Sequence, residues 1–472
     1  MYLDNPALFT DYYEVSMVQG YIGSGIADKT ATFDYFFRSL PFDSGYLIFA
    51  GLSDLIQTLE SFIFTKDDLQ FLESIGLSTT CTEWLKKFKF QGSVYSVQEG
   101  EPVFPGEPVL RVEGGLAELQ LIETLLLNIL NFQSLIATKA SRLRSAAGDK
   151  KVIDFGLRRA QGLGGIHASK AAILGGVDAT SNLYSAHRFG LASGGTMAHS
   201  WVQSFTNELT AFRSYAEIWP DDTVLLVDTY DTLESGVPNA ITVAKEMRDR
   251  GHELQGIRID SGDLAWFSRQ ARTMLDQAGF SGVKIAASNQ IDEDVICALN
   301  SQDAPIDLFG VGTRLVTADG APALDGVYKL SSIGGEPTLK ISDSPEKCTL
   351  PGNKEIIRLS DENGMFQADG IILTHEANNI PEQFILNDSG HIASGRFHHE
   401  HLLNPVMIGG KVVDELPNLH SSASYVQDRL KKLPDEFRRL REPDHYRLGY
   451  SEELLDLQKN LIREKKLRYE TE

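Results

Sequence analysis

Charged and polar residues recur directly after short apolar runs in the middle of the chain. The set is Arg158, Arg159, Asp178, Thr180, His199, Asp228, Asp231, Arg258, Asp260, Asp263, Asn289, Gly310, Gly312 and Arg314. One arginine can bond to two phosphate oxygens at once, and carboxylates hold Mg²⁺ or ribose hydroxyls. Glycines let backbone amides approach a phosphate closely. A single Asp or Arg at such a position is more often a helix cap or a salt-bridge partner. The whole set together predicts a ligand that carries several phosphates and a metal ion.

His199 is the histidine of this set, and it follows the turn at Gly194-Gly195. A lone histidine is usually a buried or capping residue. Here we expect the turn to place the imidazole near the start of a helix, where backbone amides favour an anion. A neutral imidazole there can accept a phosphoryl group, and Asp228 could bind the other ring nitrogen and fix the tautomer. We therefore interpret His199 as a nucleophile.

A parallel sheet is the element expected to position these residues. Apolar runs that end in glycine or small polar residues alternate with helical stretches; the runs are 152–156, 176–180, 224–228, 256–260, 283–288 and 306–310. This alternation predicts βαβ units, in which the carboxyl ends of all strands share one face. With one further strand near Leu191, we predict an irregular α/β barrel over residues 131–330 that carries the active site. An open doubly wound sheet is the alternative, but no GxGxxG motif follows a strand.

The flanking segments have a different composition. Residues 1–130 mix helix and strand, with several short apolar runs broken by Gly and Pro between positions 92 and 112. We expect an α+β domain there. Residues 331–472 are rich in strands and turns and are expected to return to the N-terminal domain. Their last part, 424–468, is charged and predicted to be a helical tail.

Composition narrows the class of protein. The chain has 472 residues, of which 42% are hydrophobic, and a formal net charge of −21. A chain this acidic repels nucleic acid and anionic membranes, and we therefore expect neither as a partner. Residues 1–6 lack a basic signal-peptide region, and no run of 18 apolar residues occurs. The widely spaced Cys81, Cys297 and Cys348 predict neither disulfides nor a zinc knuckle, which favours the cytoplasm.

An ordered series of motifs resembles the nicotinate phosphoribosyltransferase family. The motifs are Thr10-Asp11-Tyr12-Tyr13, Phe33-Asp34-Tyr35-Phe36-Phe37-Arg38, Ser44-Gly45-Tyr46, Asp154-Phe155-Gly156-Leu157-Arg158-Arg159, Gly195-Thr196-Met197-Ala198-His199-Ser200, Leu226-Val227-Asp228-Thr229-Tyr230-Asp231, Arg258-Ile259-Asp260-Ser261-Gly262-Asp263 and Phe309-Gly310-Val311-Gly312-Thr313. The resemblance implies an irregular type II phosphoribosyltransferase barrel with a second domain built from both chain ends. It also implies a homodimer with active sites at the interface.

The same resemblance implies a reaction. The family joins nicotinate to phosphoribosyl pyrophosphate in NAD salvage, with Mg²⁺ as cofactor and ATP as co-substrate. The histidine that matches His199 is phosphorylated during coupled ATP hydrolysis. His199, Asp228 and Arg258 are therefore the expected catalytic residues.

Binding roles carried over from the family are expectations for single positions. Phe155 should stack on one face of the pyridine and Tyr13 of the partner subunit on the other. Arg158 and Arg258 should contact phosphate or the nicotinate carboxylate. Asp178 and Thr180 should lie near the pyridine substituent, and Asp228 should orient His199. The 5′-phosphate should be surrounded by Gly310, Gly312 and Thr313. Mg²⁺ should be held by Asp260 and Asp263, and Asp260 is also expected to bind ribose hydroxyls.

Two other functions fit the residues. A nicotinamide phosphoribosyltransferase would share the histidine, and Asp178 would suit an amide donor. A sensor that binds a phosphosugar or nucleotide without turnover would need the arginines and glycines but not His199. Separately, the histidines at 391, 398, 399 and 401 could bind a metal, although loop histidines without matching cysteines are usually unbound.

Overall fold

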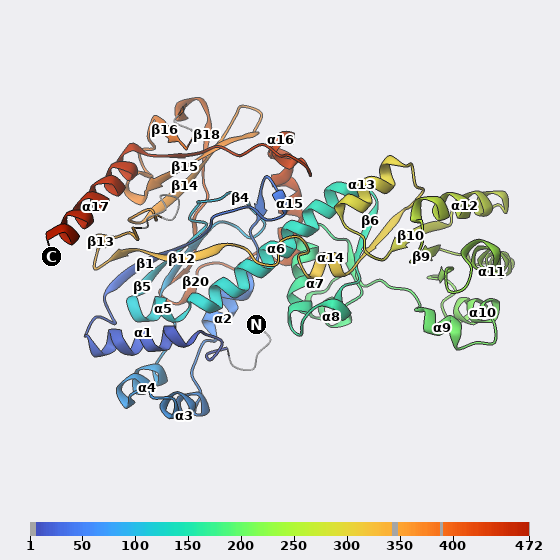
Figure 1. The fold of residues 1–472 in the computed structure, drawn as a ribbon, viewed down its shortest axis with the longest axis horizontal. Coiled ribbons are helices and arrows are strands. Elements are labelled where there is room, and N and C mark those ends of the chain that lie inside the picture. Colours follow the sequence, from blue (N-terminus) through green and yellow to red (C-terminus); the bar gives the residue numbers. More distant parts are fainter. Residues whose placement is uncertain (1–5, 342–347, 388–389, 472) are drawn as a thin grey trace. The chain divides into compact units, whose positions relative to one another are not determined.

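The computed structural model describes residues 6–341, 348–387 and 390–471, and the chain divides into two compact units. The first unit joins Met1–Leu135 to Ala323–Glu472, and the second is Ile136–Pro322. Helix α6 (Glu123–Ala147) has 25 residues that begin in the first unit and end in the second (Figure 1). No helix in the described part of the chain has the length and hydropathy that crossing a membrane requires.

The second unit is built on a parallel sheet of six strands. In chain order these are β6 (Lys151–Asp154), β7 (Ala179–Thr180), β8 (Val224–Leu226), β9 (Gly256–Ile259), β10 (Lys284–Ser288) and β11 (Leu308–Val311). They lie in the order β7-β6-β11-β10-β9-β8, and every pair is parallel. A parallel bridge from Thr180 to Ser193 adds a seventh position, close to the strand predicted near Leu191.

The ring of strands is interrupted at one place. Within residues 136–322, all of which are described, no strand pairing joins β8 to the segment at Ser193. The side chain of Arg258 in β9 instead donates hydrogen bonds to Thr196 Oγ1 and to the carbonyl oxygen of Met197, 3.2 Å away. A charged side chain thus replaces backbone pairing at the gap, and the barrel is irregular there.

Helices follow the strands of this sheet. They are the 3₁₀ turn η2 (Leu157–Arg159), α7 (Gly164–Leu174), α8 (Leu183–Phe189), α9 (His199–Gln203), α10 (Glu208–Ile218), the π turn η3 (Thr232–Gly236), α11 (Val237–Asp249), α12 (Leu264–Gln277), α13 (Glu293–Ser301) and α14 (Thr313–Val316). The core between helices and sheet includes Met247, Leu275, Ile257 and Ile285, all essentially inaccessible to solvent. Each such side chain contributes roughly 1.5–3 kcal/mol by leaving water.

In the first unit, strands from both ends of the chain share one antiparallel sheet. Its members are β1 (Thr30–Phe37), β3 (Ser93–Ser96), β5 (Leu110–Gly115), β12 (Gly326–Ile333), β13 (Glu336–Pro337), β19 (Asn404–Ile408) and β20 (Lys411–Val412). Strand β1 pairs with β5 on one side and with β12 on the other, although β12 lies almost 300 residues later in the chain (Figure 1). The β1 strand is almost entirely buried, as its run of aromatic and β-branched residues favours.

A second sheet of the first unit comes from the C-terminal segment alone. It consists of β14 (Lys354–Ser360), β15 (Phe366–Leu373), β16 (Gln383–Leu386), β17 (His391–Ala393), β18 (His398–His401) and β21 (Leu448–Tyr450); β2 (Leu47–Ile48) and β4 (Pro102–Val103) form a separate pair. Arg358 of β14 is completely buried and bonds to the carboxylates of Asp369 and Glu101. The positive charge of Arg358 is thus paired with carboxylates of the same unit, because a charge buried away from water is costly unless it is paired.

The remaining helices of the first unit come from both of the chain segments that form it. They are α1 (Tyr12–Gly23), η1 (Pro41–Asp43), α2 (Leu52–Glu60), α3 (Lys66–Ser74), α4 (Thr79–Lys86), α5 (Leu116–Leu121), η5 (Thr374–Glu376), η6 (Ser394–Arg396), α15 (Leu419–Lys432), α16 (Asp435–Arg438) and α17 (Glu452–Thr471). The charged helical region predicted over 424–468 contains most of α15, all of α16 and most of α17, and strand β21 lies between the last two helices. Three residues are enough for β21 to pair with β15 and β16, too few to show a strand pattern in the sequence.

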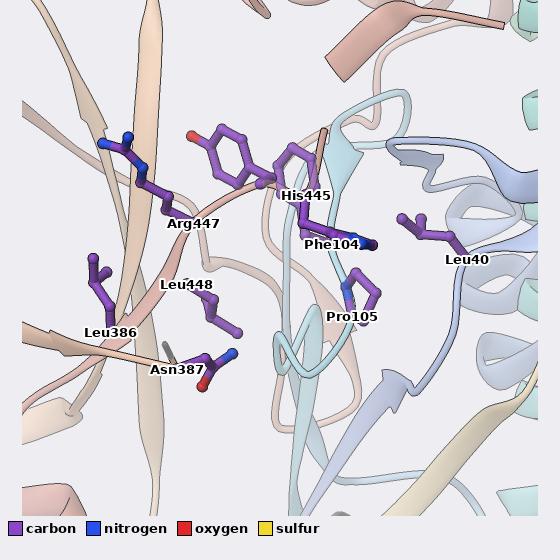
Figure 2. A pocket seen from close by; sticks show the side chains of 9 residues that line it. Leu40, Phe104, Pro105, Leu386, Asn387, His445, Arg447 and Leu448 are labelled. Carbon is purple, nitrogen blue, oxygen red and sulfur yellow. The ribbon is translucent and has the colours of Figure 1, made fainter. Parts of the chain in front are cut away.

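The first unit also contains a cavity of about 310 Å³ (Figure 2). Its wall includes the stacked rings of Phe104 and Tyr446, whose centroids are 3.7 Å apart. His445 and Arg447 add polar groups to an otherwise largely apolar lining. All of the lining residues belong to the first unit.

Candidate active site

The carboxyl edge of the parallel sheet brings together most of the predicted catalytic residues. Asp228 follows β8, Arg258 lies in β9 and Asp260 follows it. The carboxylates of Asp260 and Asp228 and the guanidinium of Arg158 all act on the charge of Arg258. Four ionisable groups from three strand ends are therefore close enough to influence one another.

Arg258 is held in place from two directions. Its terminal nitrogens bond to Thr196 Oγ1 and Met197 O, and its guanidinium carbon lies 6.0 Å from the centroid of the Phe155 ring. Burial lowers the pKa of Arg258, while the carboxylates of Asp260 and Asp228 act in the opposite direction. The Nε atom is buried and has no hydrogen-bond partner among the described residues. Because a buried donor is costly to leave unpaired, this N–H points to a missing acceptor.

Asp228 and Asp260 form a linked pair of carboxylates. Asp228 Oδ2 accepts hydrogen bonds from the backbone N–H of Asp260 at 2.9 Å and from Ser261 Oγ at 2.6 Å. Its other oxygen, Oδ1, is buried and without a partner in the part of the chain that the structure describes. Asp260 accepts a hydrogen bond from Ser288 Oγ. One oxygen of the pair therefore has an unused capacity to accept a hydrogen bond or to ligate a cation.

His199 is the first residue of α9 and is partly exposed. Its Nδ1 lies 3.1 Å from Thr229 Oγ1. Among the described residues, no hydrogen bond joins Asp228 to His199, and the expectation that Asp228 orients His199 stays a prediction. Asp228 is turned toward the next strand end, and the hydroxyl of the following residue contacts the imidazole.

The ring of Phe155 packs directly against the backbone of Gly310. A Cβ atom on Gly310 would lie 2.4 Å from Phe155 Cε2, so the ring occupies the space that a side chain at position 310 would fill. Phe155 N also donates a 2.7 Å hydrogen bond to Val311 O. The absence of a side chain at Gly310 thus makes room for an aromatic ring, whereas the sequence suggested a phosphate. Gly312 and Thr313 follow at the start of α14, where a Cβ on Gly312 would lie 3.2 Å from Phe155 O.

Thr180 and Asp178 are not brought to this cluster as expected. Thr180 is fully buried, and its hydroxyl donates to Asp154 Oδ2 at 2.8 Å. Asp178 precedes β7, where Oδ2 accepts from Arg144 Nη2 at 2.6 Å and from Val152 N at 2.7 Å. These contacts occupy the amino end of the strand. Both side chains are thus bonded within the protein, and their assignment to the pyridine substituent stays a prediction.

Asp263 has a local role in the fold, and its assignment to the metal stays a prediction. It is the N-cap of α12 and accepts a 2.9 Å hydrogen bond from Trp266 N. Across the described residues, no group of three or more His, Cys, Asp or Glu side chains could hold a metal ion. Mg²⁺, however, is usually bound by one or two carboxylates together with substrate phosphates. Asp260 with the unpaired Oδ1 of Asp228 fits that requirement better than Asp260 with Asp263, whose Oδ1 caps a helix.

Two predicted residues lie on exposed elements. Arg158 is exposed on η2, directly after Phe155 and Gly156. Tyr13 belongs to the first unit, where its side chain is 43% exposed at the start of α1. Burial, helped by Glu123 and Glu14, raises the pKa of Tyr13 to about 12, so its hydroxyl is neutral at physiological pH.

Sequence reasoning missed three residues of the site. Thr229 contacts His199, Ser288 contacts Asp260, and Asp154 anchors the turn that carries Phe155. Thr229 and Asp154 lie inside recognised motifs, and Ser288 ends a predicted strand. Their positions were therefore visible in the sequence, but their contacts depend on the side-chain directions in the fold.

A parallel sheet with charged and polar side chains gathered at its carboxyl edge is the arrangement of an α/β enzyme. Sequence models match most of the chain: the nicotinate phosphoribosyltransferase (NAPRTase) N-terminal domain at residues 8–131, the NAPRTase family at 150–369 and the C-terminal domain at 353–458. The chain belongs to the nicotinate phosphoribosyltransferase family, whose members are enzymes of NAD biosynthesis.

Individual relatives agree with this membership. The nicotinate phosphoribosyltransferase of Bacillus subtilis (strain 168) is 43% identical over 480 residues, which cover 99% of this chain and 98% of that protein. The crystal structure of human nicotinic acid phosphoribosyltransferase has a TM-score of 0.87 at 31% identity and covers 96% of this chain and 99% of its own. A nicotinate-nucleotide pyrophosphorylase from Pyrococcus furiosus has a TM-score of 0.72 at 25% identity, with coverages of 92% and 98%. The predicted fold class and family are confirmed.

Proposed function

We propose that this chain joins nicotinate to phosphoribosyl pyrophosphate, forming nicotinate mononucleotide and pyrophosphate, at the carboxyl edge of the second unit. The observation that carries the proposal is Arg258, whose buried Nε–H has no acceptor in the described chain and whose guanidinium lies 6.0 Å from the Phe155 ring centroid. A planar aromatic acid satisfies both groups, because its ring can stack on Phe155 while its carboxylate accepts from Arg258.

The transfer itself requires little covalent chemistry from the protein. The lone pair of the pyridine nitrogen forms the bond to ribose C1′ while the bond from C1′ to the pyrophosphate oxygen breaks, and pyrophosphate leaves with that electron pair. Positive charge develops on the ribose during this step. Phe155 holds the nitrogen in line, Arg158 binds phosphate oxygens, and the backbone of Gly312 and Thr313 receives the 5′-phosphate.

Mg²⁺ is part of this proposal because Asp228 Oδ1 is buried without a partner among the described residues, beside Asp260. Asp260 and Asp228 would hold the ion, and Asp260 would also bind ribose hydroxyls. When bound, Mg²⁺ supplies positive charge that stabilises the leaving pyrophosphate. Asp263 stays at its helix cap.

ATP coupling is assigned to His199. An imidazole nitrogen attacks the γ-phosphorus of ATP, the bond to the bridging oxygen breaks, and ADP leaves. Water later hydrolyses the phosphohistidine to inorganic phosphate. Thr229 supports this role, because its hydroxyl lies 3.1 Å from Nδ1 and restricts rotation of the ring. His199→Ala should therefore abolish ATP stimulation and leave slow transfer without ATP.

The acid is favoured over the amide by the position of Asp178. A nicotinamide enzyme would use a carboxylate to accept from the amide N–H₂, and Asp178 was the sequence candidate. Its Oδ2 instead bonds to Arg144 and to the Val152 amide at the amino end of β7. The fixed cation Arg258 suits the negative charge of nicotinate.

A cytoplasmic homodimer, with Tyr13 of one subunit completing the site of the other, belongs to the same proposal. The exposure of Tyr13 and of its neighbour Tyr12, 43% and 64%, supports a role at a surface. Light scattering of the purified protein gives the oligomeric state. Mixing Tyr13→Ala and Arg258→Ala chains tests a shared site, because a mixed dimer contains one intact site and regains activity. Two inactive variants that stay inactive after subunit exchange would contradict it.

The first experiment is an assay of purified protein with phosphoribosyl pyrophosphate and Mg²⁺, offering nicotinate or nicotinamide, with and without ATP. We expect nicotinate mononucleotide to form, faster with ATP, and little product from nicotinamide. Preference for nicotinamide would overturn the acid assignment. Ligand binding without product from either base would identify a sensor.

A further inference from the structure

Asp154 is a buried carboxylate to which the reaction assigns no part. It ends strand β6, has no exposed surface and lies directly before Phe155. Its Oδ1 accepts from Gly156 N, and its Oδ2 accepts from Ser169 Oγ and Thr180 Oγ1, each at 2.8 Å. The three donors come from the turn after β6, from α7 and from β7. One side chain therefore ties three elements together at the carboxyl edge.

The direction of these hydrogen bonds is set by Asn182. Its side-chain N–H₂ donates to Ser169 Oγ at 3.1 Å, and its backbone N–H donates to Thr180 Oγ1 at 3.0 Å. Both hydroxyls already accept a hydrogen bond, so each can direct its own proton to Asp154. Ser169 Oγ also lies 3.0 Å from Gly165 O and 3.4 Å from Thr180 Oγ1, but the contacts of the two hydroxyls with Asp154 are shorter, and Gly156 N–H has Asp154 as its acceptor. Burial raises the pKa of Asp154, while these three bonds act in the opposite direction.

The turn that Asp154 anchors carries the aromatic ring of the site. Phe155 is fixed on one side by its N–H bond to Val311 O, 2.7 Å, and on the other by the bond from Gly156 N to Asp154. Its ring lies in the space left by Gly310. A Cβ on Gly156 would lie 2.1 Å from Val316 Cγ1, so the backbone here is packed closely against α14. A shift of the turn would move the ring relative to Arg258.

We infer that Asp154 is a positioning residue that sets the affinity for the aromatic acceptor by holding the Phe155 ring in register with Arg258. The inference rests on the proposed function, since it assumes that the acceptor stacks on Phe155. Asp154 touches no reacting atom. Its effect should therefore appear in recognition of nicotinate and be small for phosphoribosyl pyrophosphate, which does not use the ring.

Asp154→Asn is the direct test, because the amide keeps the size of the side chain but offers one acceptor in place of two. We expect KM for nicotinate to rise roughly tenfold, as for other supporting residues of a site, with KM for phosphoribosyl pyrophosphate little changed. In a Phe155→Ala background the same change should alter KM for nicotinate by less than about twofold, because the two residues act as one unit.

A matched control separates this role from general stability. Asp307→Asn changes another aspartate of the sheet, whose Oδ2 accepts a 2.9 Å hydrogen bond from Ile285 N at the amino end of the strands. We expect KM for nicotinate to stay at the wild-type value in this variant. Ser169→Ala serves where Asp154→Asn does not fold, since it removes one donor and leaves the carboxylate. It should raise the same KM roughly threefold.

The outcomes distinguish this inference from the function on which it rests. Wild-type protein that makes no nicotinate mononucleotide overturns the proposed function. An active wild type whose Asp154→Asn and Ser169→Ala variants keep the wild-type KM for nicotinate overturns the inference. Equal increases in KM for both substrates, or full additivity with Phe155→Ala, would also overturn it.

Discussion

His199 Nδ1 and Thr229 Oγ1 lie 3.1 Å apart at the open end of the sheet. Thr229 immediately follows Asp228, whose carboxylate is turned toward Asp260 and Ser261. The two neighbouring residues thus serve two different parts of the site: one restrains the imidazole and the other helps to form the anionic pair. The loop after β8 couples the histidine to the carboxylates through the backbone.

Thr229→Val should weaken ATP coupling. The methyl group that replaces the hydroxyl cannot bond to Nδ1, so the ring loses an interaction worth about 0.5–1.5 kcal/mol. We expect the ATP stimulation of transfer and the labelling of the protein by γ-labelled ATP to fall roughly three- to tenfold. Thr229→Ser, which keeps the hydroxyl, should retain most of both. Equal values for the Val variant and the wild type would remove Thr229 from the coupling.

Arg258→Lys should impair recognition of nicotinate. A lysine keeps the charge, but its single nitrogen cannot reproduce the planar fork in which two nitrogens bond to Thr196 and Met197 and Nε–H is left for the acceptor. Loss of a charge-assisted hydrogen bond costs about 1.5–3 kcal/mol, so KM for nicotinate should rise roughly ten- to hundredfold. Arg269→Lys is the control, because Arg269 donates to Gln302 O on the helical side of the sheet. An unchanged KM in Arg258→Lys would exclude Arg258 as the carboxylate ligand.

The sequence was a reliable guide to which strands form and where they end. Runs of apolar residues at 224–228 and 256–260 became β8 and β9, and the polar residues at their ends share one edge because parallel strands align their carboxyl ends. Asp228, Arg258 and Asp260 were therefore correctly placed near one another. No pairing of residues far apart in the chain was needed for that conclusion.

Side-chain direction and strand length were not predictable in the same way. The run 176–180 gives a strand of only two residues, Ala179–Thr180, so Asp178 precedes the strand and faces its amino end. Thr180 ends the strand but points to Asp154, inside the protein. The sequence assigns Gly310 to a phosphate site, whereas in the structure the ring of Phe155, which lies 155 residues earlier in the chain, fills the space beside it. Each of these contacts depends on tertiary packing.

Asp263 and Asp260 should respond differently to Mg²⁺. Asp263→Ala removes the N-cap of α12 and should lower the free energy of unfolding by about 1 kcal/mol, with the Mg²⁺ dependence of the reaction unchanged. Asp260→Asn should raise the Mg²⁺ concentration needed for half-maximal velocity, because a carboxylate ligand becomes neutral. Titration of both variants with Mg²⁺ makes the comparison. A shift in Asp263→Ala as large as in Asp260→Asn would return Asp263 to the metal site.

Stability at alkaline pH should depend on Glu107 of the first unit. This carboxyl group is completely buried, and burial together with the adjacent Asp369 raises its pKa well above the ordinary value. The folded state therefore binds the proton more tightly than the unfolded state. The stability that this proton contributes is fully present below the unfolded pKa and is lost as the pH rises through the folded pKa.

Glu107→Gln tests that sign. The amide can still accept from Phe104 N, which bonds to Glu107 Oε2 at 2.9 Å, and its N–H₂ can donate to Asp369 at any pH. We expect the melting temperature of the variant, relative to that of the wild type, to increase as the pH rises from 5 to 9. Glu83→Gln, at an exposed pair with Lys86, should show no such trend. A difference between Glu107→Gln and wild type that is constant with pH would mean that Glu107 is ionised in the folded protein throughout this range, contrary to the raised pKa.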